Sequence, residues 1–359
     1  MIEHKKRNFC SGPAHMPKAV IDDTIQALSN FRNTGLSITE IYHRDLRYID
    51  LLGETKALLN NLCDLQDQFE ILFLTGGATA LFGTIPANLL SNDRSAAFID
   101  TGRWAAMAMD EASLYGQVKC IASSADSQYD HIPMVEGLND LNDAYLHITS
   151  NNTVMGSQYQ NLPDTNIPLV VDMSSDILSR PCDYQKASII YAGAQKNLGA
   201  AGVTICLIKK DMLKDGPVRS LQRTEDLSKH IAAASNLNTP PVLNIYIVNA
   251  MLHWIESEGK ESLWEANQKK ADLLYKELDR NSLFEAHVKE GSRSNMNVTF
   301  NSSSAELEAS FKSLAADYGF EQISGHRSIG GMRVALYNAI PFEWVEDLVE
   351  LMQLFEEQH

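Results

Sequence analysis

The most constraining feature of this sequence is a series of short apolar runs, each ending at a glycine or a small polar residue. The runs span residues 69–74, 96–100, 144–148, 168–171, 188–191 and 202–208. Helix-like segments, such as 79–90 and 103–115, separate several of them. Strands that are apolar on both faces and alternate with helices are typical of a mostly parallel sheet covered by helices. The sequence therefore predicts an α/β fold.

The pattern changes after about Pro241. From there the predicted helices span 243–258, 260–279, 305–318 and a terminal segment from 343, and the predicted strands span 297–300 and 332–337. We interpret this part as a smaller α+β unit. The sequence thus predicts a large domain over residues 15–255 and a small C-terminal domain over 256–359, with residues 1–14 packed on the small domain.

Charge and cysteine content exclude several classes of protein. Thirty basic side chains face 46 acidic ones, for a net charge of −16, so no long basic surface for nucleic acid can form. The five cysteines form no CxxC pair, which argues against structural zinc and disulfides and favours reduced, buried thiols. The N-terminus lacks the apolar core of a secretory signal, and no apolar run is long enough to span a membrane. We expect a soluble, cytoplasmic protein without a metal site.

One lysine, Lys196, stands among small residues directly after the run at 188–191, in the segment YAGAQKNLG. An ordinary surface lysine is the default interpretation, and a nucleophilic amine that forms a Schiff base is the alternative. Asp172 closes the preceding apolar run, as a turn cap or as an acid that reaches a ligand nitrogen. Because the ends of adjacent parallel strands meet at one sheet edge, we expect Asp172 and Lys196 side by side.

Two further strand ends suit the same chemistry. Residues 76–79 read GGAT before a helix, so backbone N–H groups there can hold a phosphate, although a plain tight turn explains the glycines equally well. Trp104 follows another strand end, where core packing is the commoner role of a tryptophan. An aldehyde cofactor needs an amine, an acid, an aromatic platform and an amide nest. Together these features favour pyridoxal phosphate.

Longer motifs around these residues resemble the phosphoserine aminotransferases, a family of class V aminotransferases with the type I fold of pyridoxal-phosphate enzymes. The resemblance covers nearly the whole chain. It is carried by FCSGPA at 9–14, LTGGAT at 74–79, DTGRW at 100–104, TSNNT at 149–153, DMSSDILSRP at 172–181, YAGAQKN at 191–197, NTPP at 238–241 and GHRSIGGMR at 325–333. The segments at 172–181 and 191–197 are the most specific.

The resemblance implies catalytic and ring-binding roles at the matching positions. Lys196 would form the Schiff base with pyridoxal 5′-phosphate, and Asp172 would hold the pyridine nitrogen protonated. Trp104 would stack on the ring, while Thr153 and Gln195 would bond near its 3-hydroxyl group.

The resemblance also implies how the cofactor phosphate is held. Gly77 and Ala78 would bind it through backbone amides. Members of the family are homodimers with shared active sites, so Asn238 and Thr239 would complete the phosphate site from the other subunit.

Two His-Arg pairs point to an anionic substrate. They are His43-Arg44 and His326-Arg327, and Arg333 follows the second pair. Arginine pairs bidentately with phosphate or carboxylate, and a neighbouring histidine adds a donor. Solvated arginines are the commoner case for any one pair, but two identical pairs in an acidic chain make that interpretation weaker. The resemblance assigns the pairs to the substrate phosphate and Arg333 to the α-carboxylate.

Some positions depart from the family pattern. Asp45 stands where a serine is usual, in the segment Tyr42-His-Arg-Asp, so an acid adjoins a proposed phosphate ligand. Asn152 replaces a usual glutamate, Leu81 a usual glutamine and Ala200 a usual proline. None of these positions carries bond-making chemistry, so the departures bear on substrate affinity more than on the type of reaction.

The resemblance therefore implies a phosphoserine:2-oxoglutarate aminotransferase of serine biosynthesis and, through the analogous phosphorylated four-carbon acid, of pyridoxine biosynthesis in some bacteria. A class V aminotransferase for an unphosphorylated 2-oxo acid is one alternative, and an inactive pyridoxal-phosphate-binding regulatory protein is another. A cysteine desulfurase fits poorly, because no cysteine follows Cys206. The predicted partners are glutamate, a phosphorylated 2-oxo acid and a second copy of the chain.

Overall fold

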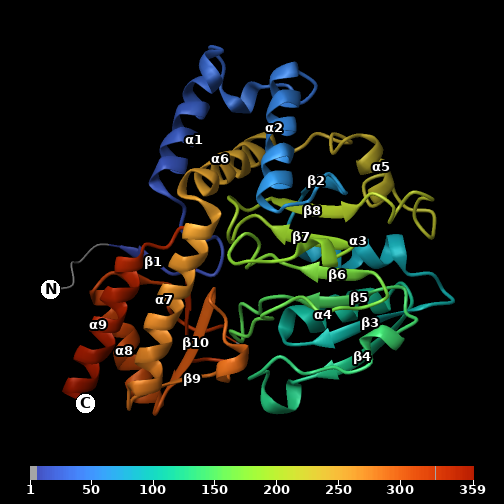
Figure 1. Ribbon diagram of the computed structural model, residues 1–359. Coiled ribbons are helices and arrows are strands. Elements are labelled where there is room, and N and C mark those ends of the chain that lie inside the picture. The colour runs from blue at the N-terminus through green and yellow to red at the C-terminus, as the bar shows by residue number, and fades with distance from the viewer. Residues whose placement is uncertain (1–5, 328) are drawn as a thin grey trace.

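A computed structural model describes residues 6–327 and 329–359. Its centre is a seven-stranded sheet with the strand order β2-β8-β7-β6-β5-β3-β4 (Figure 1). The strands are β2 (Phe69–Thr75), β3 (Ser95–Asp100), β4 (Gln117–Ser123), β5 (Leu146–Thr149), β6 (Leu169–Asp172), β7 (Ile189–Gly193) and β8 (Val203–Lys209). Only β8 runs antiparallel to its neighbours in this sheet. The predicted mostly parallel sheet is confirmed, and its parallel strands end at one edge.

Both faces of the sheet are buried because its strands are apolar throughout. Val171 of β6 packs in a core with residues of α2 and α6, while the adjacent Val170 packs on the opposite face with residues of α3 and α4. The helices of this part are α1 (Lys18–Asn30), α2 (Leu46–Leu62), α3 (Thr79–Leu89), α4 (Arg103–Ser113), α5 (Leu227–Ala232) and α6 (Val242–Glu258). Short 3₁₀ helices span Phe31–Asn33, Ile38–Glu40, Ala125–Ser127, Leu138–Asp140, Tyr184–Lys186 and Glu290–Ser292.

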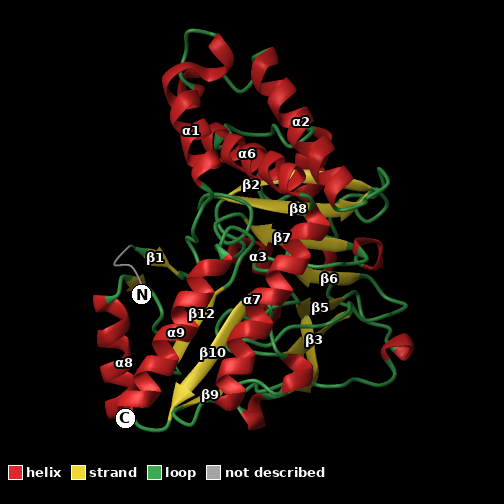
Figure 2. Cartoon of the chain, turned by 60° about the vertical axis from the view of Figure 1, so that its left-hand side comes forward, coloured by secondary structure: helices red, strands yellow, loops and turns green. Residues whose placement is uncertain are grey.

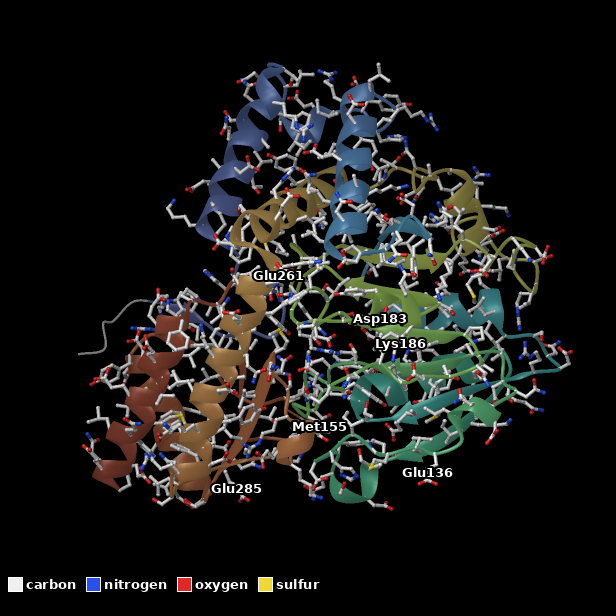
Figure 3. All side chains as sticks on the ribbon, in the orientation of Figure 1. Glu136, Met155, Asp183, Lys186, Glu261 and Glu285 are labelled. Carbon is white, nitrogen blue, oxygen red and sulfur yellow. The ribbon has the colours of Figure 1, made fainter. Side chains whose placement is uncertain are left out.

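The C-terminal part, which lies beside the central sheet in Figure 2, has a core of its own, built around Phe300, Phe311 and Leu348. Its helices are α7 (Lys260–Arg280), α8 (Ala305–Asp317) and α9 (Phe342–Gln358). Its antiparallel sheet has the order β12-β10-β9, and the strands are β9 (Phe284–Ala286), β10 (Asn297–Ser302) and β12 (Met332–Ala335). The side chain of Thr299 donates to the carbonyl of Met155 at 2.6 Å, which ties β10 to the loop after β5. Figure 3 labels Met155 where this loop meets the C-terminal part.

The N-terminal segment crosses from this part to the central sheet. Strand β1 (Arg7–Asn8) pairs in parallel with β11 (Phe320–Glu321), and the N–H of Ala14 donates to the carbonyl of Gln195 at 2.9 Å. The predicted domain boundary at residue 255 falls in the last turn of α6, before the cap at Gly259. The division into domains stays a prediction, and residues 1–5 of the predicted N-terminal segment lie outside the described residues.

The edge strand β4 departs from the expectations. Its side chains are mostly exposed, so it lacks the apolar run that predicts the other strands. All five cysteines are free thiols, but Cys120 on this strand is exposed, so the expectation of buried thiols is wrong there. In the described part of the chain, no helix has the length and hydropathy of a membrane span.

Candidate active site

The predicted lysine and acid lie at neighbouring strand ends. Strand β6 ends at Asp172, and β7 leads into the turn that carries Lys196. The two strands pair in parallel, with Asp172 opposite Tyr191. Both Asp172 and Lys196 line a cavity of about 260 Å³. Larger cavities of about 630 and 670 Å³ contain neither residue, so the chemistry of the lining and not the size of the cavity identifies the site.

The same cavity collects most of the predicted residues. Besides Asp172 and Lys196, the predicted residues in its lining are Gly77, Ala78, Trp104, Thr153, Gln195, His326 and Arg333. The lining also includes Cys10, Ser11 and Gly12, which sequence reasoning missed. Gly12 has a φ of +132°, and a Cβ there would lie 3.3 Å from Cγ of Lys196. A side chain at this position would crowd the lysine, and the glycine was the available signal.

Burial shifts the pKa of both central groups. Desolvation lowers the pKa of the Lys196 amine; Asp172 opposes this shift and Arg333 adds to it. Desolvation raises the pKa of Asp172, against the attraction of Lys196 and the N–H of Ser174, which lies 2.9 Å from the carboxylate. A lysine with a lowered pKa is a better nucleophile near neutral pH. A cation placed against a buried carboxylate stabilises its charged form more than it would at the protein surface.

An indole forms one wall of the cavity. Nε1 of Trp104 donates to Oγ1 of Thr153 at 2.9 Å, and Nζ of Lys196 lies 5.6 Å from the centroid of the indole ring. Trp104 also packs against the apolar core on this face of the sheet, so the core role and the pocket role coincide. Within the described residues, Oε1 of Gln195 is buried without a hydrogen-bond partner. Such an orphaned acceptor suits a ligand that donates a hydrogen bond.

Positive charge reaches the cavity from two sides. Helix α3 begins without a side-chain cap at Ala78, so its positive end is available to an anion. Arg333 of β12 donates to the carbonyl of Thr153 at 2.9 Å, and its Nε is buried without a partner among the described residues. His326 lies in the lining, while the adjacent Arg327 is exposed outside it. The cavity suits a ligand with more than one anionic group.

The other predicted residues lie away from the cavity. His43 and Arg44 precede α2, and the side chain of Asn236 donates to the His43 carbonyl at 2.8 Å, which brings the segment of Asn238 and Thr239 alongside. None of the described residues that line the cavity belongs to these segments. Both views show α2 at the end of the sheet away from β10 (Figures 1 and 2). One chain therefore holds two separate groups of predicted residues.

Asp45 is engaged locally. It caps the N-terminus of α2 by accepting from the N–H of Arg47 at 2.9 Å, and it accepts two bonds from the Arg47 side chain at 2.8 and 2.6 Å. Arg47 lowers the pKa of this carboxyl to about 2. Among the other departures, Asn152 is buried and donates to Thr101 at 3.0 Å, and Leu81 packs in the core.

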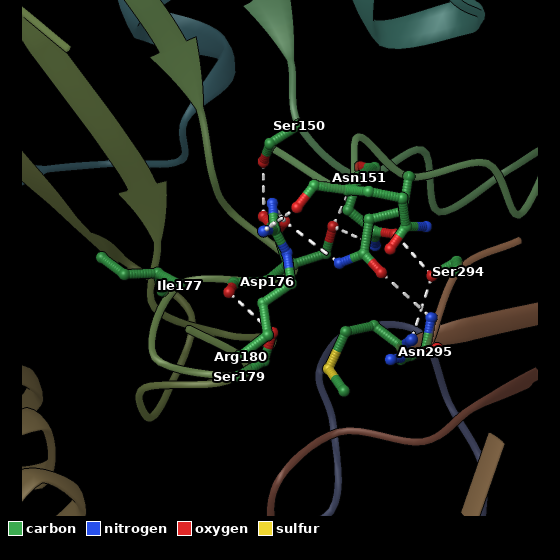
Figure 4. Close-up of polar contacts among 12 residues, drawn as sticks. Ser150, Asn151, Asp176, Ile177, Ser179, Arg180, Ser294 and Asn295 are labelled. Atoms are coloured by element: carbon green, nitrogen blue, oxygen red, sulfur yellow. Dashed lines mark hydrogen bonds and ion pairs between the residues drawn. The ribbon is translucent and has the colours of Figure 1, made fainter. Parts of the chain in front are cut away.

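A buried polar network connects the loops that follow strands β5 and β6 (Figure 4). The carboxylate of Asp176 accepts from Oγ of Ser150 at 2.5 Å and from Arg180 at 3.3 Å. The side-chain oxygen of Asn151 accepts from Oγ of Ser294 at 2.5 Å, which joins the loop after β5 to the C-terminal part. Satisfied buried networks of this kind hold neighbouring segments in one arrangement. This network fixes the loop that presents Thr153.

Comparisons with known proteins cover the whole chain. Residues 7–348 match the family model for class V aminotransferases. A phosphoserine aminotransferase of Lysinibacillus sphaericus is 42% identical over 356 residues, which are 98% of each chain. The solved phosphoserine aminotransferase of Bacillus circulans subsp. alkalophilus is 39% identical, with a TM-score of 0.94 and 98% of each chain covered. The PLP-bound phosphoserine aminotransferase of Trichomonas vaginalis is 30% identical, with a TM-score of 0.91, over 97% of this chain and 100% of the other. This chain therefore belongs to the class V aminotransferases and, within them, to the phosphoserine aminotransferase family.

Proposed function

We propose that this enzyme transfers the amino group of glutamate to 3-phosphohydroxypyruvate, giving phosphoserine and 2-oxoglutarate, with pyridoxal 5′-phosphate as its cofactor. Membership of the phosphoserine aminotransferase family supports the reaction and a role in serine biosynthesis. One observation carries the assignment of the site: Lys196 and Asp172 lie at adjacent strand ends in one cavity.

The residues of this cavity fit pyridoxal phosphate. The uncapped start of α3, with Gly77 and Ala78, suits the phosphate group, and the indole of Trp104 suits a flat ring. The orphaned Oε1 of Gln195 would accept a hydrogen bond from the ring hydroxyl, and Thr153 would bond beside it. When bound, the cofactor supplies an aldehyde that takes up amines and a ring that withdraws electrons from the bonds at that carbon.

Lys196 would act twice in each half-reaction. Its amine would hold the cofactor at the aldehyde, and when free of the cofactor the same amine would take up and return the proton at the substrate α carbon. Burial lowers the pKa of this amine, which favours its neutral, proton-accepting form. Asp172 would lie against the ring nitrogen, where its carboxylate would stabilise positive charge.

The substrate would lie between Arg333 and the His326-Arg327 pair. Nε of Arg333 is buried in the cavity region and has no hydrogen-bond partner in the part of the chain that the structure describes, which suits the α-carboxylate of either substrate. His326 and Arg327 would bind the phosphate of 3-phosphohydroxypyruvate or the γ-carboxylate of glutamate. A four-carbon phosphorylated 2-oxo acid has the same groups, so we extend the proposal to pyridoxine biosynthesis.

A second copy of this chain would complete the site. His43 and Arg44 lie beside the segment of Asn238 and Thr239 but away from the cavity of their own chain. In a homodimer that places this surface over the cavity of the other chain, His43 and Arg44 would reach the substrate phosphate. Asn238 and Thr239 would reach the cofactor phosphate. Nearby α1 exposes an apolar stripe that suits such an interface, formed by Ile21, Ile25 and Leu28.

Single-turnover amination tests the proposed function. The enzyme is first converted to its amino form with glutamate and then mixed with 3-phosphohydroxypyruvate, pyruvate or glyoxylate. We expect glutamate to remove the visible absorbance of the bound cofactor and the phosphorylated acid to restore it fastest. Equal rates with all three acids would support an aminotransferase of broader specificity, and no spectral change with glutamate would support a binding protein without catalysis.

A further inference from the structure

We propose that Arg103 is a further substrate-binding residue, which contacts the substrate phosphate together with His326 and Arg327 and makes the enzyme selective for phosphorylated 2-oxo acids. This inference rests on the proposed function and adds a residue to it. Neither the two His-Arg pairs nor the cofactor motif assigns Arg103 a role.

Arg103 lies directly beside a residue of the cavity lining. It is the first residue of α4, directly before Trp104, whose indole lines the cavity. The guanidinium carbon of Arg103 lies 5.8 Å from the centroid of that indole ring. Its side chain is exposed, whereas that of Trp104 is half-buried. A group placed this way is open to an incoming ligand on one side and held by the indole on the other.

Electrostatics bring Arg103 together with the predicted phosphate-binding residues. Burial lowers the pKa of His326, and three nearby guanidinium groups lower it further, those of Arg103, Arg333 and Arg327. Arg103 is therefore close enough to the His326 imidazole to act on its charge, although the two residues come from opposite parts of the chain. The start of α4 has no side-chain cap at Gly102, so its helix dipole adds to the same positive field.

The charge of Arg103 is not neutralised by a carboxylate of the described residues. Some other arginines do pair with an acid, as Arg47 does with Asp45 and Arg280 with Glu277. Among residues 6–327 and 329–359, Arg103 forms no ion pair. Arg327 and Arg333 also form no ion pair among these residues, so three guanidinium groups near His326 are not neutralised by a carboxylate. A dianionic phosphate gains from each such guanidinium, while an uncharged hydroxyl group at the same place gains little.

The test compares two substrates that differ only in the phosphate. Single-turnover kcat/KM is measured for 3-phosphohydroxypyruvate and for 3-hydroxypyruvate with the wild-type holoenzyme and with Arg103→Gln, Arg103→Lys and Arg223→Gln. Arg223 is the control, because it is exposed on the loop between β8 and α5 and its change removes the same charge. We expect Arg103→Gln to lower kcat/KM about tenfold for the phosphorylated acid and less than about twofold for the other. Arg103→Lys should recover part of the loss, because it keeps the charge but not the fork.

Two results would overturn the proposal. One is an equal loss for both substrates in Arg103→Gln, which would mean that the change disturbs Trp104 or the cofactor; the visible absorbance of bound cofactor reports that disturbance directly. The other is a loss no greater than that of Arg223→Gln, which would mean that only overall charge matters. A wild-type enzyme without preference for the phosphorylated acid would instead reject the proposed function itself, so the two failures are distinguishable.

Discussion

The two ends of the active site are built in opposite ways. The cofactor end lies at the carboxyl edge of the central sheet, where Asp172 and Lys196 are held by adjacent strands and supported by a buried polar network. The substrate end consists of exposed or half-buried cations, most of them on loops, and two of these, His43 and Arg44, lie away from the cavity of their own chain. The residues that carry out the reaction are thus held by rigid elements. The residues that recognise the substrate lie on segments that a second chain would complete.

This difference predicts different responses to mutation. At the cofactor end each group is desolvated, so the loss of one leaves another buried charge without compensation. At the substrate end each cation is partly solvated and shares its task with others, so the loss of one removes a single contact. Changes at the first end should act on kcat by orders of magnitude, and changes at the second should act mainly on KM.

The largest expected effect is that of Lys196→Ala. No other amine lines the cavity among the described residues, so turnover should fall by on the order of 10⁴-fold or more. The visible absorbance of the lysine-bound cofactor should vanish while the thermal unfolding transition stays cooperative. Lys186→Ala is the matched control, because Lys186 pairs with the exposed Asp164 on the surface. If a Lys196→Ala enzyme still transaminated, the proposed cofactor end would not be the place where the reaction occurs.

Asp172→Asn and Asp176→Asn separate chemistry from support within one buried segment. The neutral amide at 172 no longer compensates a cation at the ring nitrogen, so kcat should fall about 10²- to 10⁴-fold, which corresponds to roughly 3–5 kcal/mol. Asp176 instead pairs with the buried Arg180, so its change should mainly lower the free energy of unfolding. Stopped-flow kinetics and urea unfolding measure the two effects. Near-normal turnover by Asp172→Asn would reduce Asp172 to a turn cap.

Single arginine-to-alanine substitutions test the substrate end. Arg327→Ala and Arg44→Ala should each raise the KM for 3-phosphohydroxypyruvate by about ten- to a hundredfold, as expected for the loss of one charge-assisted bond of about 1.5–3 kcal/mol. The KM for glutamate should rise less, because its γ-carboxylate carries a single charge. Steady-state kinetics with each substrate varied in turn measure this. Small, equal effects on both substrates would contradict the phosphate assignment.

Subunit mixing tests whether the active site is shared between two chains. Equal amounts of Lys196→Ala and Thr239→Trp protein, each inactive alone, are exchanged under mild denaturant and assayed. Half of the dimers would be hybrids with one intact site of two, so activity should recover to about a quarter of the wild-type value. Mass spectrometry confirms that subunits have exchanged. If hybrids form and activity stays absent, Thr239 serves its own chain.

The same contrast explains how far the sequence predicts this structure. Asp172, Lys196 and Trp104 are predictable because apolar runs mark the strands, and parallel strands bring their ends to one edge. The packing of Gly12 against Lys196 is not, because it joins segments far apart in the chain by tertiary contact alone. Strand β4 is missed because an exposed edge strand need not be apolar. The separation of His43 and Arg44 from the cavity has no local sequence signal, since it depends on the packing of the whole chain.

The smallest expected effect is at Asp45, the acid beside the predicted phosphate ligand Arg44. If its carboxylate pointed toward the substrate phosphate, it would weaken substrate binding, and Asp45→Ser would strengthen that binding. Its carboxylate instead accepts three bonds from Arg47, so its charge is already compensated. Serine caps a helix as well as aspartate does. We therefore expect Asp45→Ser to change the KM for 3-phosphohydroxypyruvate by less than about twofold, because exposed ion pairs contribute little.

A second variant makes this small effect informative. Arg47→Ala leaves the charge of Asp45 without its partner, so the KM for the phosphorylated substrate should rise, and adding Asp45→Ser to that variant should bring it back. The KM for glutamate measured in parallel shows whether the change acts through the phosphate. A fall of more than about fivefold in the KM of the single Asp45→Ser variant would mean that Asp45 faces the substrate despite its bonds to Arg47. The carboxylate of Asp45 would then belong to the substrate end and would repel the substrate phosphate. The solvent exposure of the substrate end would then not be enough to explain why substitutions there change KM less than substitutions at the cofactor end change kcat.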